Sequence, residues 1–276
     1  MKMPQITGHS GCEGTPRDSM ASIERAEALN ADAVEVDIRC GADGILRLSH
    51  DRLPESEYRE KPTLEAVFRR LAQTNLRLNC DIKEPFAIPE TLKLAQRFGF
   101  DRSRLILSGS VSAELLALEP VIGERASVYL NIEEAMKFLY MRELQRRGQE
   151  GCFAELMEHA QAFMPDMLAD DGVEPLLRMI APLPVWGLNL PHELLTPALA
   201  LKFREKNIRL SVWTVNEPAD LERCLALGAD NITTLAVGAA AACRQAYVLC
   251  HGQCGAPPRQ RTENHAGLKK DCTGIR

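Results

Sequence analysis

Apolar residues along this chain fall into two kinds of segment: short continuous runs, and longer stretches in which they recur every three or four positions. The short runs have the length of buried strands, and the longer stretches have the periodicity of amphipathic helices. The predicted strands are residues 5–9, 33–39, 76–83, 104–109, 126–131, 185–190, 209–215 and 231–234. The predicted helices between them are residues 19–29, 64–71, 88–98, 197–206 and 218–227. Their alternation is typical of a parallel sheet whose strands are joined by crossover helices.

The number of predicted strands favours a closed barrel. Eight strands within 276 residues suit the α/β architecture of a (β/α)8 or TIM barrel, which commonly needs about 250 residues. An open, doubly wound sheet is the alternative. Residues 132–184 are too long for a single connection, and we expect helices over 133–147 and 152–163 to fill most of this stretch.

The character of the sequence changes near its end. From Cys250 onward the chain is polar, rich in proline and glycine, and without hydrophobic periodicity. We therefore predict a barrel over residues 1–243 and a disordered tail over residues 244–276. The cysteines and histidines of this tail follow no spacing that zinc sites commonly use, so they do not indicate a metal site.

Composition and charge narrow the range of functions further. Hydrophobic residues make up 45% of the chain, which is ample for one large core, and the net charge of −5 argues against a nucleic-acid-binding protein. No apolar stretch of about 18 residues appears, so no membrane span is expected. The nine irregularly spaced cysteines indicate mostly reduced thiols, and we expect a cytoplasmic protein. The sequence does not indicate an oligomeric state.

Two carboxylates share one face of the second predicted strand. Side chains alternate along a strand, so in the apolar run at residues 33–38 Glu35 and Asp37 point to the side opposite the valines and Ile38. Neighbouring carboxylates on a buried strand repel each other and are costly to desolvate unless a cation lies between them. A strand whose second face is simply exposed to water is the alternative.

Several other polar residues fall where predicted strands end. His9 ends the first strand, Asp81 and Lys83 end the third, and Trp213 lies near the end of the seventh. His50 closes a short apolar extension beyond the second strand. In a (β/α)8 barrel the active site forms at the carboxyl ends of the strands, so these side chains should gather in one place.

The residue types at these positions suit chemistry on a phosphodiester. Glu35, Asp37 and Asp81 would offer three hard oxygen ligands, which suit Mg²⁺ or Ca²⁺ rather than zinc. Lys83 beside such a cation would attract an anion such as a phosphate group. Two histidines could act as general acid and general base, because the unperturbed pKa of histidine lies near 6.5. Each residue alone has an ordinary structural explanation, so the inference depends on their combination.

The same residues resemble the motifs of the glycerophosphodiester phosphodiesterase family. The segments similar to its motifs, in the family's order, are residues 8–11, 16–19, 30–32, 35–37, 43–44, 50–51, 62–65, 78–83, 213–216 and 228–233. Among them, residues 213–216 match the family's Trp-Thr-Val-Asn at every position. The resemblance extends from about Ile6 to Thr234 and leaves the tail outside.

The resemblance implies a TIM barrel that acts as a phosphoric diester hydrolase in lipid and glycerol metabolism. It would hydrolyse a small-molecule glycerophosphodiester to an alcohol and glycerol 3-phosphate, with a divalent cation held by the three carboxylates. By the same resemblance, His9 and His50 would be the acid–base pair. Lys83 would contact the phosphate, and Trp213 would line the pocket wall.

Several positions depart from the family pattern. Ser10 stands where the family has a phosphate-binding arginine, and Arg17 stands where it has a glutamate. Asp81 is one methylene shorter than the family's glutamate, and Thr234 replaces its aspartate. The stretch between residues 50 and 81 is also short, which implies a reduced form of the family's inserted subdomain.

Two of these departures suggest a compensation. We hypothesise that Arg17 supplies the positive charge lost at Ser10 and reaches the phosphate from the first helix turn by a bidentate contact. An Arg17 side chain that points to solvent is the simpler alternative. The departures also leave open a catalytically impaired barrel that binds a phosphate-containing ligand or a protein partner. A lyase that cyclises phosphodiesters with the same residues is a third hypothesis.

Overall fold

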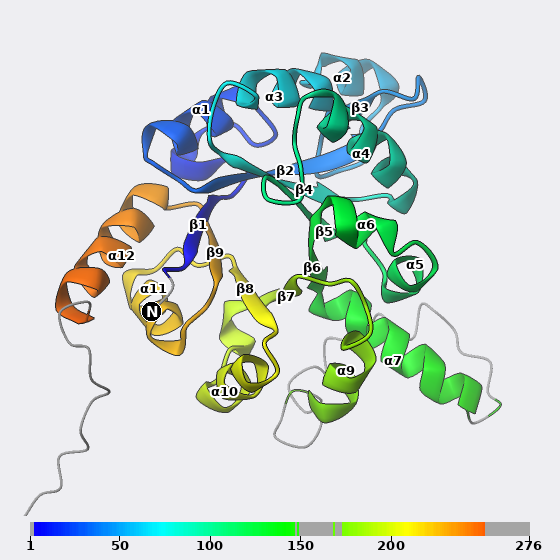
Figure 1. Cartoon of the computed structure of the whole chain (residues 1–276). Coiled ribbons are helices and arrows are strands. Elements are labelled where there is room, and N and C mark those ends of the chain that lie inside the picture. The colour runs from blue at the N-terminus through cyan, green and yellow to red at the C-terminus, as the bar shows by residue number, and fades with distance from the viewer. Residues whose placement is uncertain (1–2, 147, 149–167, 169–172, 252–276) are drawn as a thin grey trace, which may run out of the picture.

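Eight parallel strands close into a barrel, and helices surround it (Figure 1). The computed structural model describes residues 3–146, 148, 168 and 173–251. Strand β1 pairs in parallel with both β2 and β9, which closes the barrel. The barrel strands are β1 (Gln5–Gly8), β2 (Ala33–Cys40), β4 (Arg77–Ile82), β5 (Leu105–Gly109), β6 (Ser127–Asn131), β7 (Gly187–Pro191), β8 (Arg209–Trp213) and β9 (Asn231–Thr234). The predicted TIM barrel is confirmed, and the alternative of an open sheet is wrong.

Hydrophobic runs located the strands closely. Every predicted strand is present, and no predicted bound differs from the observed one by more than two residues. The short extension beyond the second strand forms β3 (Leu46–Leu48), which pairs with β2 in the antiparallel sense. That pairing brings the end of β3 back beside the carboxyl end of β2.

The predicted crossover helices are also present, and other helices join them. The five that the hydrophobic pattern predicts are α1 (Met20–Ala28), α3 (Leu64–Leu71), α4 (Ile88–Arg97), α10 (Pro197–Glu205) and α11 (Pro218–Leu227). The remaining elements are α2 (Glu55–Glu60), α5 (Ala113–Leu118), α6 (Val121–Arg125), α7 (Ile132–Arg146), α9 (Val173–Ile180), α12 (Val237–His251), and the 3₁₀ turns η1 (Cys12–Gly14), η2 (Pro85–Ala87) and η3 (His192–Leu194). Ser19, Thr63 and Thr196 cap their helices, because each side chain accepts a hydrogen bond from the backbone N–H three residues later.

The second half of the chain departs most from the expectations. Helix α7 begins and ends within one residue of the predicted 133–147, whereas the helix expected over 152–163 lies outside the described residues. The predicted barrel boundary at residue 243 falls inside α12, so residues 244–251 of the expected tail are helical. Arg244 anchors this part of α12, because its Nη1 donates to the Pro4 carbonyl oxygen at 3.0 Å and pairs with Asp32. Residues 252–276 lie outside the described residues.

The connection between β3 and β4, where the resemblance implies a reduced insertion, is short. Between β3 and β4 it contains only the small helices α2 and α3. Within the part of the chain that the structure describes, no helix is both long and apolar enough to cross a membrane.

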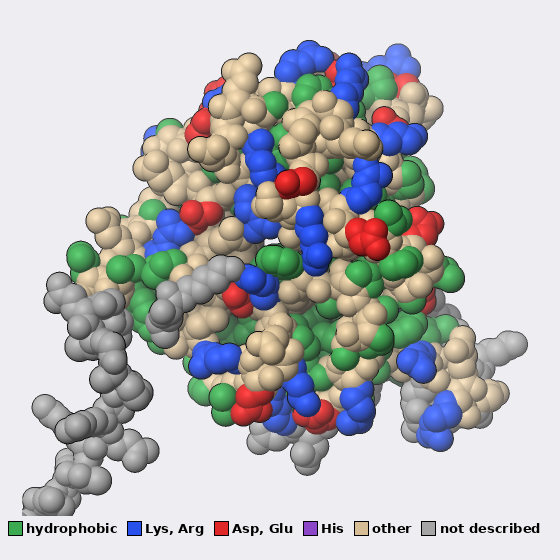
Figure 2. Space-filling model, viewed as in Figure 1, with side chains coloured by type: hydrophobic (Ala, Val, Ile, Leu, Met, Phe, Trp, Pro, Cys, Tyr) green, Lys and Arg blue, Asp and Glu red, His purple; other side chains and the backbone are tan. Residues whose placement is uncertain are grey.

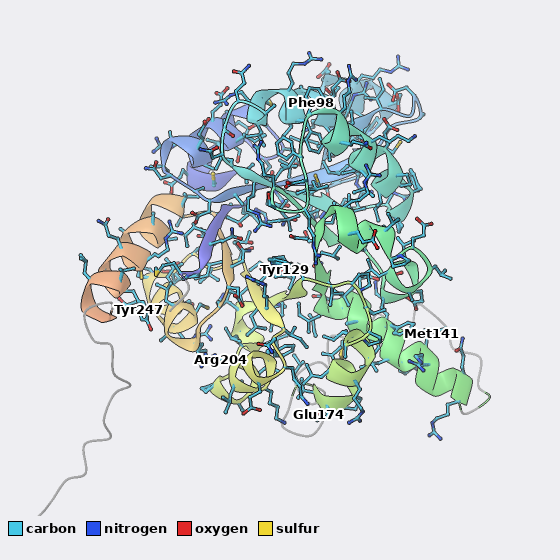
Figure 3. All side chains as sticks on the ribbon, in the orientation of Figure 1. Phe98, Tyr129, Met141, Glu174, Arg204 and Tyr247 are labelled. Atoms are coloured by element: carbon cyan, nitrogen blue, oxygen red, sulfur yellow. The ribbon has the colours of Figure 1, made fainter. Side chains whose placement is uncertain are left out.

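The barrel interior contains a small apolar cluster among polar side chains. Towards the amino ends of the strands, Ala33, Ile106 and Tyr129 form a small buried cluster that packs against Trp186. Tyr129 lies at the centre of the ring of strands in Figure 3. The larger apolar core lies between the strands and the surrounding helices. Acidic and basic side chains are interspersed on the face seen in Figure 2, where no histidine is visible.

Candidate active site

A pocket of about 260 Å³ lies at the carboxyl ends of the barrel strands, and polar and charged side chains make up most of its lining. All the site residues predicted from the sequence line it, namely His9, Arg17, Glu35, Asp37, His50, Asp81, Lys83 and Trp213. The other lining residues, which the sequence analysis missed, are Asn79, Ser108, Asn131, Glu133, Asn189 and Thr233. The barrel therefore gathers residues that are more than two hundred positions apart in the sequence.

Three carboxylates cluster on one wall of this pocket. Glu35 and Asp37 come from β2, and Asp81 comes from β4, where it lies opposite Asp37 in the parallel register. One oxygen atom from each carboxylate lies within 4.8 Å of the other two. Glu35 and Asp37 are buried, and within the described part of the chain Asp37 Oδ2 has no hydrogen-bond partner.

Burial makes negative charge unfavourable at this cluster. Burial raises the pKa of Glu35 well above its usual range, and the nearby charges of Asp37 and Asp81 raise it further. Burial also raises the pKa of Asp37 to about 6, although the Lys83 ammonium group opposes this shift. The cluster therefore holds its full negative charge only at an energetic cost.

Lys83 is the cation closest to the cluster among the described residues. Its Nζ lies 2.7 Å from Asp37 Oδ1 and 2.5 Å from Asp81 Oδ2. Burial disfavours the charged form of Lys83, but the two carboxylates outweigh burial and raise its pKa. Lys83 therefore stays protonated and bridges two of the three carboxylates.

The donor set of this cluster fits a hard divalent cation. All three side chains offer carboxylate oxygens, which Mg²⁺ and Ca²⁺ prefer and zinc does not. The unpartnered Asp37 Oδ2 supplies a free lone pair, and a cation would offset the burial and the repulsion that raise the pKa values of Glu35 and Asp37. Glu35, Asp37 and Asp81 are thus the residues that could hold such an ion.

Two histidines that follow different strands line the same pocket as the carboxylate cluster. His9 follows β1, and its Nδ1 lies 3.0 Å from the Ser10 carbonyl oxygen and 4.0 Å from Glu35 Oε2. Burial lowers the pKa of His9, although the contact with the Ser10 carbonyl opposes this. His50 lies just beyond β3, and its Nδ1 is 2.8 Å from Asp51 Oδ1. Because the His50 side chain is 47% exposed, it lies at the mouth of the pocket rather than at its base.

Ser10 takes part in a buried hydrogen-bond network and does not line the pocket. Its backbone N–H donates to Glu35 Oε2 at 3.0 Å, and its hydroxyl donates to Asp18 Oδ1 at 3.1 Å. Asp18 Oδ2 in turn accepts a hydrogen bond from the backbone N–H of His50 at 3.0 Å. The network connects the segments that carry the two histidines, a role that the sequence did not reveal.

Arg17 lies in the segment between η1 and α1. Helix α1 begins at Met20 with Ser19 as its cap, so the expectation that Arg17 occupies the first helix turn is wrong. Its side chain is exposed and lines the pocket. Burial is the main cause that lowers the pKa of His9, and the charge of Arg17 adds to it. Arg17 therefore extends its positive charge towards the same pocket as the histidines.

Gly109 has no side chain, and Asp81 occupies the space in which a side chain at position 109 would lie. A Cβ atom at Gly109 would overlap Asp81 Oδ1, and the backbone has a φ of +79°. We expect Gly109→Ala to destabilise the protein by about 3 kcal/mol or more, measured by urea unfolding. Gly99→Ala is the matched control, because its φ is +74° and a Cβ there meets no described atom within 4 Å. The control should lose only about 1–2 kcal/mol, and equal losses would contradict the steric argument.

The wall opposite the carboxylate cluster comes from β6, α7, β7 and β8. Asn189 Nδ2 donates to Asn131 Oδ1 at 3.0 Å, and these two residues are neighbours in the register of β6 and β7. Glu133 lies at the beginning of α7, and burial raises its pKa. The sequence offered one signal for them, since all three occur at or near strand ends, but they belong to none of the matched motifs.

Comparison with known proteins supports the family resemblance. No family model matches the chain. The glycerophosphodiester phosphodiesterase of Caldanaerobacter subterraneus subsp. tengcongensis is 25% identical over 247 residues, which cover 85% of this chain and 94% of that protein. The chain therefore matches this relative over nearly its whole length.

Solved structures show the same fold. A glycerophosphodiester phosphodiesterase from Thermotoga maritima has a TM-score of 0.61 at 19% identity and covers 86% of this chain and 97% of its own. A phosphodiesterase from Oleispira antarctica, solved in complex with the product sn-glycerol-3-phosphate, has a TM-score of 0.60 at 15% identity, covering 88% and 97%. Together with the relative above, these structures confirm the resemblance that the motifs indicated.

Proposed function

We propose that the chain, a divergent member of the glycerophosphodiester phosphodiesterase family, hydrolyses a glycerophosphodiester to an alcohol and glycerol 3-phosphate. The observation that carries the proposal is the presence of two histidines, Lys83 and three clustered carboxylates in one pocket. Each part answers a requirement of phosphodiester hydrolysis, which needs charge neutralisation and two proton transfers. The products belong to lipid and glycerol metabolism.

The carboxylates and Lys83 bind the charged part of the substrate in this proposal. Glu35, Asp37 and Asp81 hold a divalent cation, which supplies positive charge to the non-bridging oxygens of the phosphate when it is bound. Lys83 lies between Asp37 and Asp81, where its ammonium group can donate to a phosphate oxygen. A small phosphodiester then has its phosphorus beside β2 and β4.

The histidines carry the protons. In the net reaction, the bond between phosphorus and the alcohol oxygen breaks, and an oxygen atom from water becomes bonded to phosphorus. One of His9 and His50 accepts the proton of the attacking oxygen, and the other donates a proton to the leaving alcohol. Their presence in the same pocket as the carboxylate cluster suits this division of roles.

Product identity tests this proposal. We expect phosphorus NMR of a reaction with glycerophosphocholine to show glycerol 3-phosphate as the final phosphorus-containing product. A cyclic glycerol phosphate that persists as the final product would instead indicate a lyase. Recovery of unchanged substrate from folded protein with Mg²⁺ or Ca²⁺ would favour the catalytically impaired barrel.

The role of Arg17 can be tested separately. If Arg17 contacts the phosphate in place of the arginine absent at Ser10, Arg17→Ala should raise KM about 10-fold and leave kcat nearly unchanged. Arg25→Ala is the matched control, because Arg25 is exposed on α1 and does not line the pocket. Steady-state kinetics at the same ionic strength measure KM and kcat of the two variants. Wild-type KM in Arg17→Ala would mean that this side chain faces solvent and compensates for nothing.

A further inference from the structure

The pocket has two walls of different character. Arg17, Lys83, both histidines and the carboxylate cluster come from β1 to β4 and the segments that follow those strands. The opposite wall contains Glu133, Asn189 and Trp213, and it has just one charged side chain among the described residues. If the phosphate lies beside β2 and β4, this second wall faces another part of the substrate.

The second wall holds polar atoms without partners. Among the described residues, eight buried side-chain nitrogen and oxygen atoms make no hydrogen bond. Four of these are arginine Nε atoms, and the other four all line the pocket. One of them is Asp37 Oδ2, in the carboxylate cluster, and the remaining three are Glu133 Oε2, Asn189 Oδ1 and Trp213 Nε1. Because buried polar groups are normally satisfied, three such atoms on one pocket wall point to a ligand.

The three atoms select for a particular chemistry. Glu133 Oε2 and Asn189 Oδ1 are acceptors, and Trp213 Nε1 is a donor. Two acceptors need two donors from the ligand, and the indole N–H needs an acceptor. An ammonium group donates but cannot accept, so it would leave Trp213 unsatisfied. A second anionic group would be repelled by Glu133. Two hydroxyl groups, each of which both donates and accepts, satisfy all three atoms.

We infer that Glu133, Asn189 and Trp213 form a subsite that binds a diol of the substrate, across the pocket from the phosphate. This inference depends on the proposed function for the position of the phosphate, and it adds the residues that select the substrate. The diol belongs either to the glycerol that remains on the phosphate or to a hydroxylated alcohol that leaves. The small pocket, about 260 Å³, suits a compact polar group in either case.

Binding measurements test the subsite without turnover. In calorimetry with Mg²⁺ present, Glu133→Ala should weaken binding of glycerol 3-phosphate about 10-fold and leave binding of inorganic phosphate unchanged. Glu134→Ala is the matched control, because Glu134 pairs with Lys137 at 2.6 Å and does not line the pocket. Equal losses for both ligands in Glu133→Ala would overturn the inference. No effect of either variant on either ligand would exclude the glycerol from the subsite and leave the leaving alcohol, which kinetics tests. Asn189→Ala provides a second variant if Glu133→Ala fails to fold.

Kinetics with three substrates identify which part of the substrate carries the diol. Glycerophosphocholine has a diol only in its glycerol, bis(glycerol) phosphate has one on each side, and methyl p-nitrophenyl phosphate has none. Glu133→Ala should raise KM for at least one of the first two about 10-fold and leave the third unchanged. An effect on glycerophosphocholine places the glycerol in the subsite, and an effect on bis(glycerol) phosphate alone places the leaving alcohol there.

Equal effects on all three substrates would overturn the inference. Wild-type protein that turns over none of them would refute the proposed function while calorimetry still tests the subsite.

Discussion

Replacing His50 with alanine is expected to lower kcat by about 10²–10⁴-fold, the range that one positioned acid–base residue contributes. The fold should tolerate the change, because the His50 side chain is 47% exposed and its ring contacts Asp51, which is itself exposed. Loss of a proton-transfer group without loss of binding groups predicts a KM within a few-fold of wild type. Circular dichroism and steady-state kinetics on the same preparation measure both effects.

A histidine outside the pocket provides the control for this prediction. His192 lies in η3 beside Asp220 and Glu193, away from the pocket lining. His192→Ala should keep the wild-type kcat as long as the protein folds. His9→Ala should resemble His50→Ala, and the double variant should lose little more than either single one, since the two act as a unit. Near-wild-type kcat in either single variant would remove that histidine from the mechanism.

Asp37→Asn is expected to have opposite effects on metal binding and on stability. The substitution removes one of three charged oxygen ligands, so Mg²⁺ affinity measured by calorimetry should fall by about 100-fold or more. Without metal, however, the variant should be more stable than wild type at pH 8. The reason is that burial raises the pKa of Asp37 to about 6, so its ionised form is unfavourable in the folded protein.

The sign and the pH range follow from proton linkage. The folded protein holds the Asp37 proton more tightly than the unfolded chain does, because the pKa rises from 3.8 to about 6. The contribution of this proton to the free energy of unfolding is fully present below pH 3.8, and it is lost as the pH rises through about 6. At about 1.4 kcal/mol per unit of pKa, wild type is less stable at pH 8 by up to about 3 kcal/mol. Asparagine avoids this loss, so we expect a gain of about 1–3 kcal/mol that shrinks as the pH falls towards 4.

Asp43→Asn is the control for this pH argument, because the expected sign is reversed. Arg47 binds Asp43 through two contacts of 2.9 Å, and this hydrogen bonding lowers the pKa of Asp43 to about 2. Asp43→Asn should therefore be less stable than wild type at pH 8. Urea unfolding in EDTA at pH 5 and pH 8 measures both variants. A metal-free Asp37→Asn that is less stable than wild type at pH 8 would show that its contact with Lys83 outweighs the burial of its charge.

The sequence predicted the barrel because the hydrophobic pattern is sufficient for that purpose. Buried strands leave continuous apolar runs, so even the short β9 was located to the residue. Helix α12 was not predicted, and its final turns depend on tertiary contacts. Arg244 reaches Pro4 and Asp32, which lie more than two hundred residues earlier in the chain. No local pattern could have revealed these contacts.

The candidate site was predictable in part for a related reason. Parallel strands bring their carboxyl ends together, so Glu35, Asp37 and Asp81 could be expected to meet. The hydrogen bonds between Ser10 and Asp18 could not, because they depend on a loop in which Asp18 has a φ of +53°. Glu133 escaped notice because its importance depends on an unpaired oxygen atom, which a sequence does not show.

The most direct test of the central claim is the release of glycerol 3-phosphate from a panel of glycerophosphodiesters, with EDTA and then with Mg²⁺ or Ca²⁺ restored. The account predicts release that stops in EDTA and returns with the cation, because Glu35, Asp37 and Asp81 provide the donor set for it. No release from any panel member, from protein that is folded and binds the cation in calorimetry, would contradict the account. The chain would then be a barrel that binds a phosphate-containing ligand or a protein partner without hydrolysing a diester.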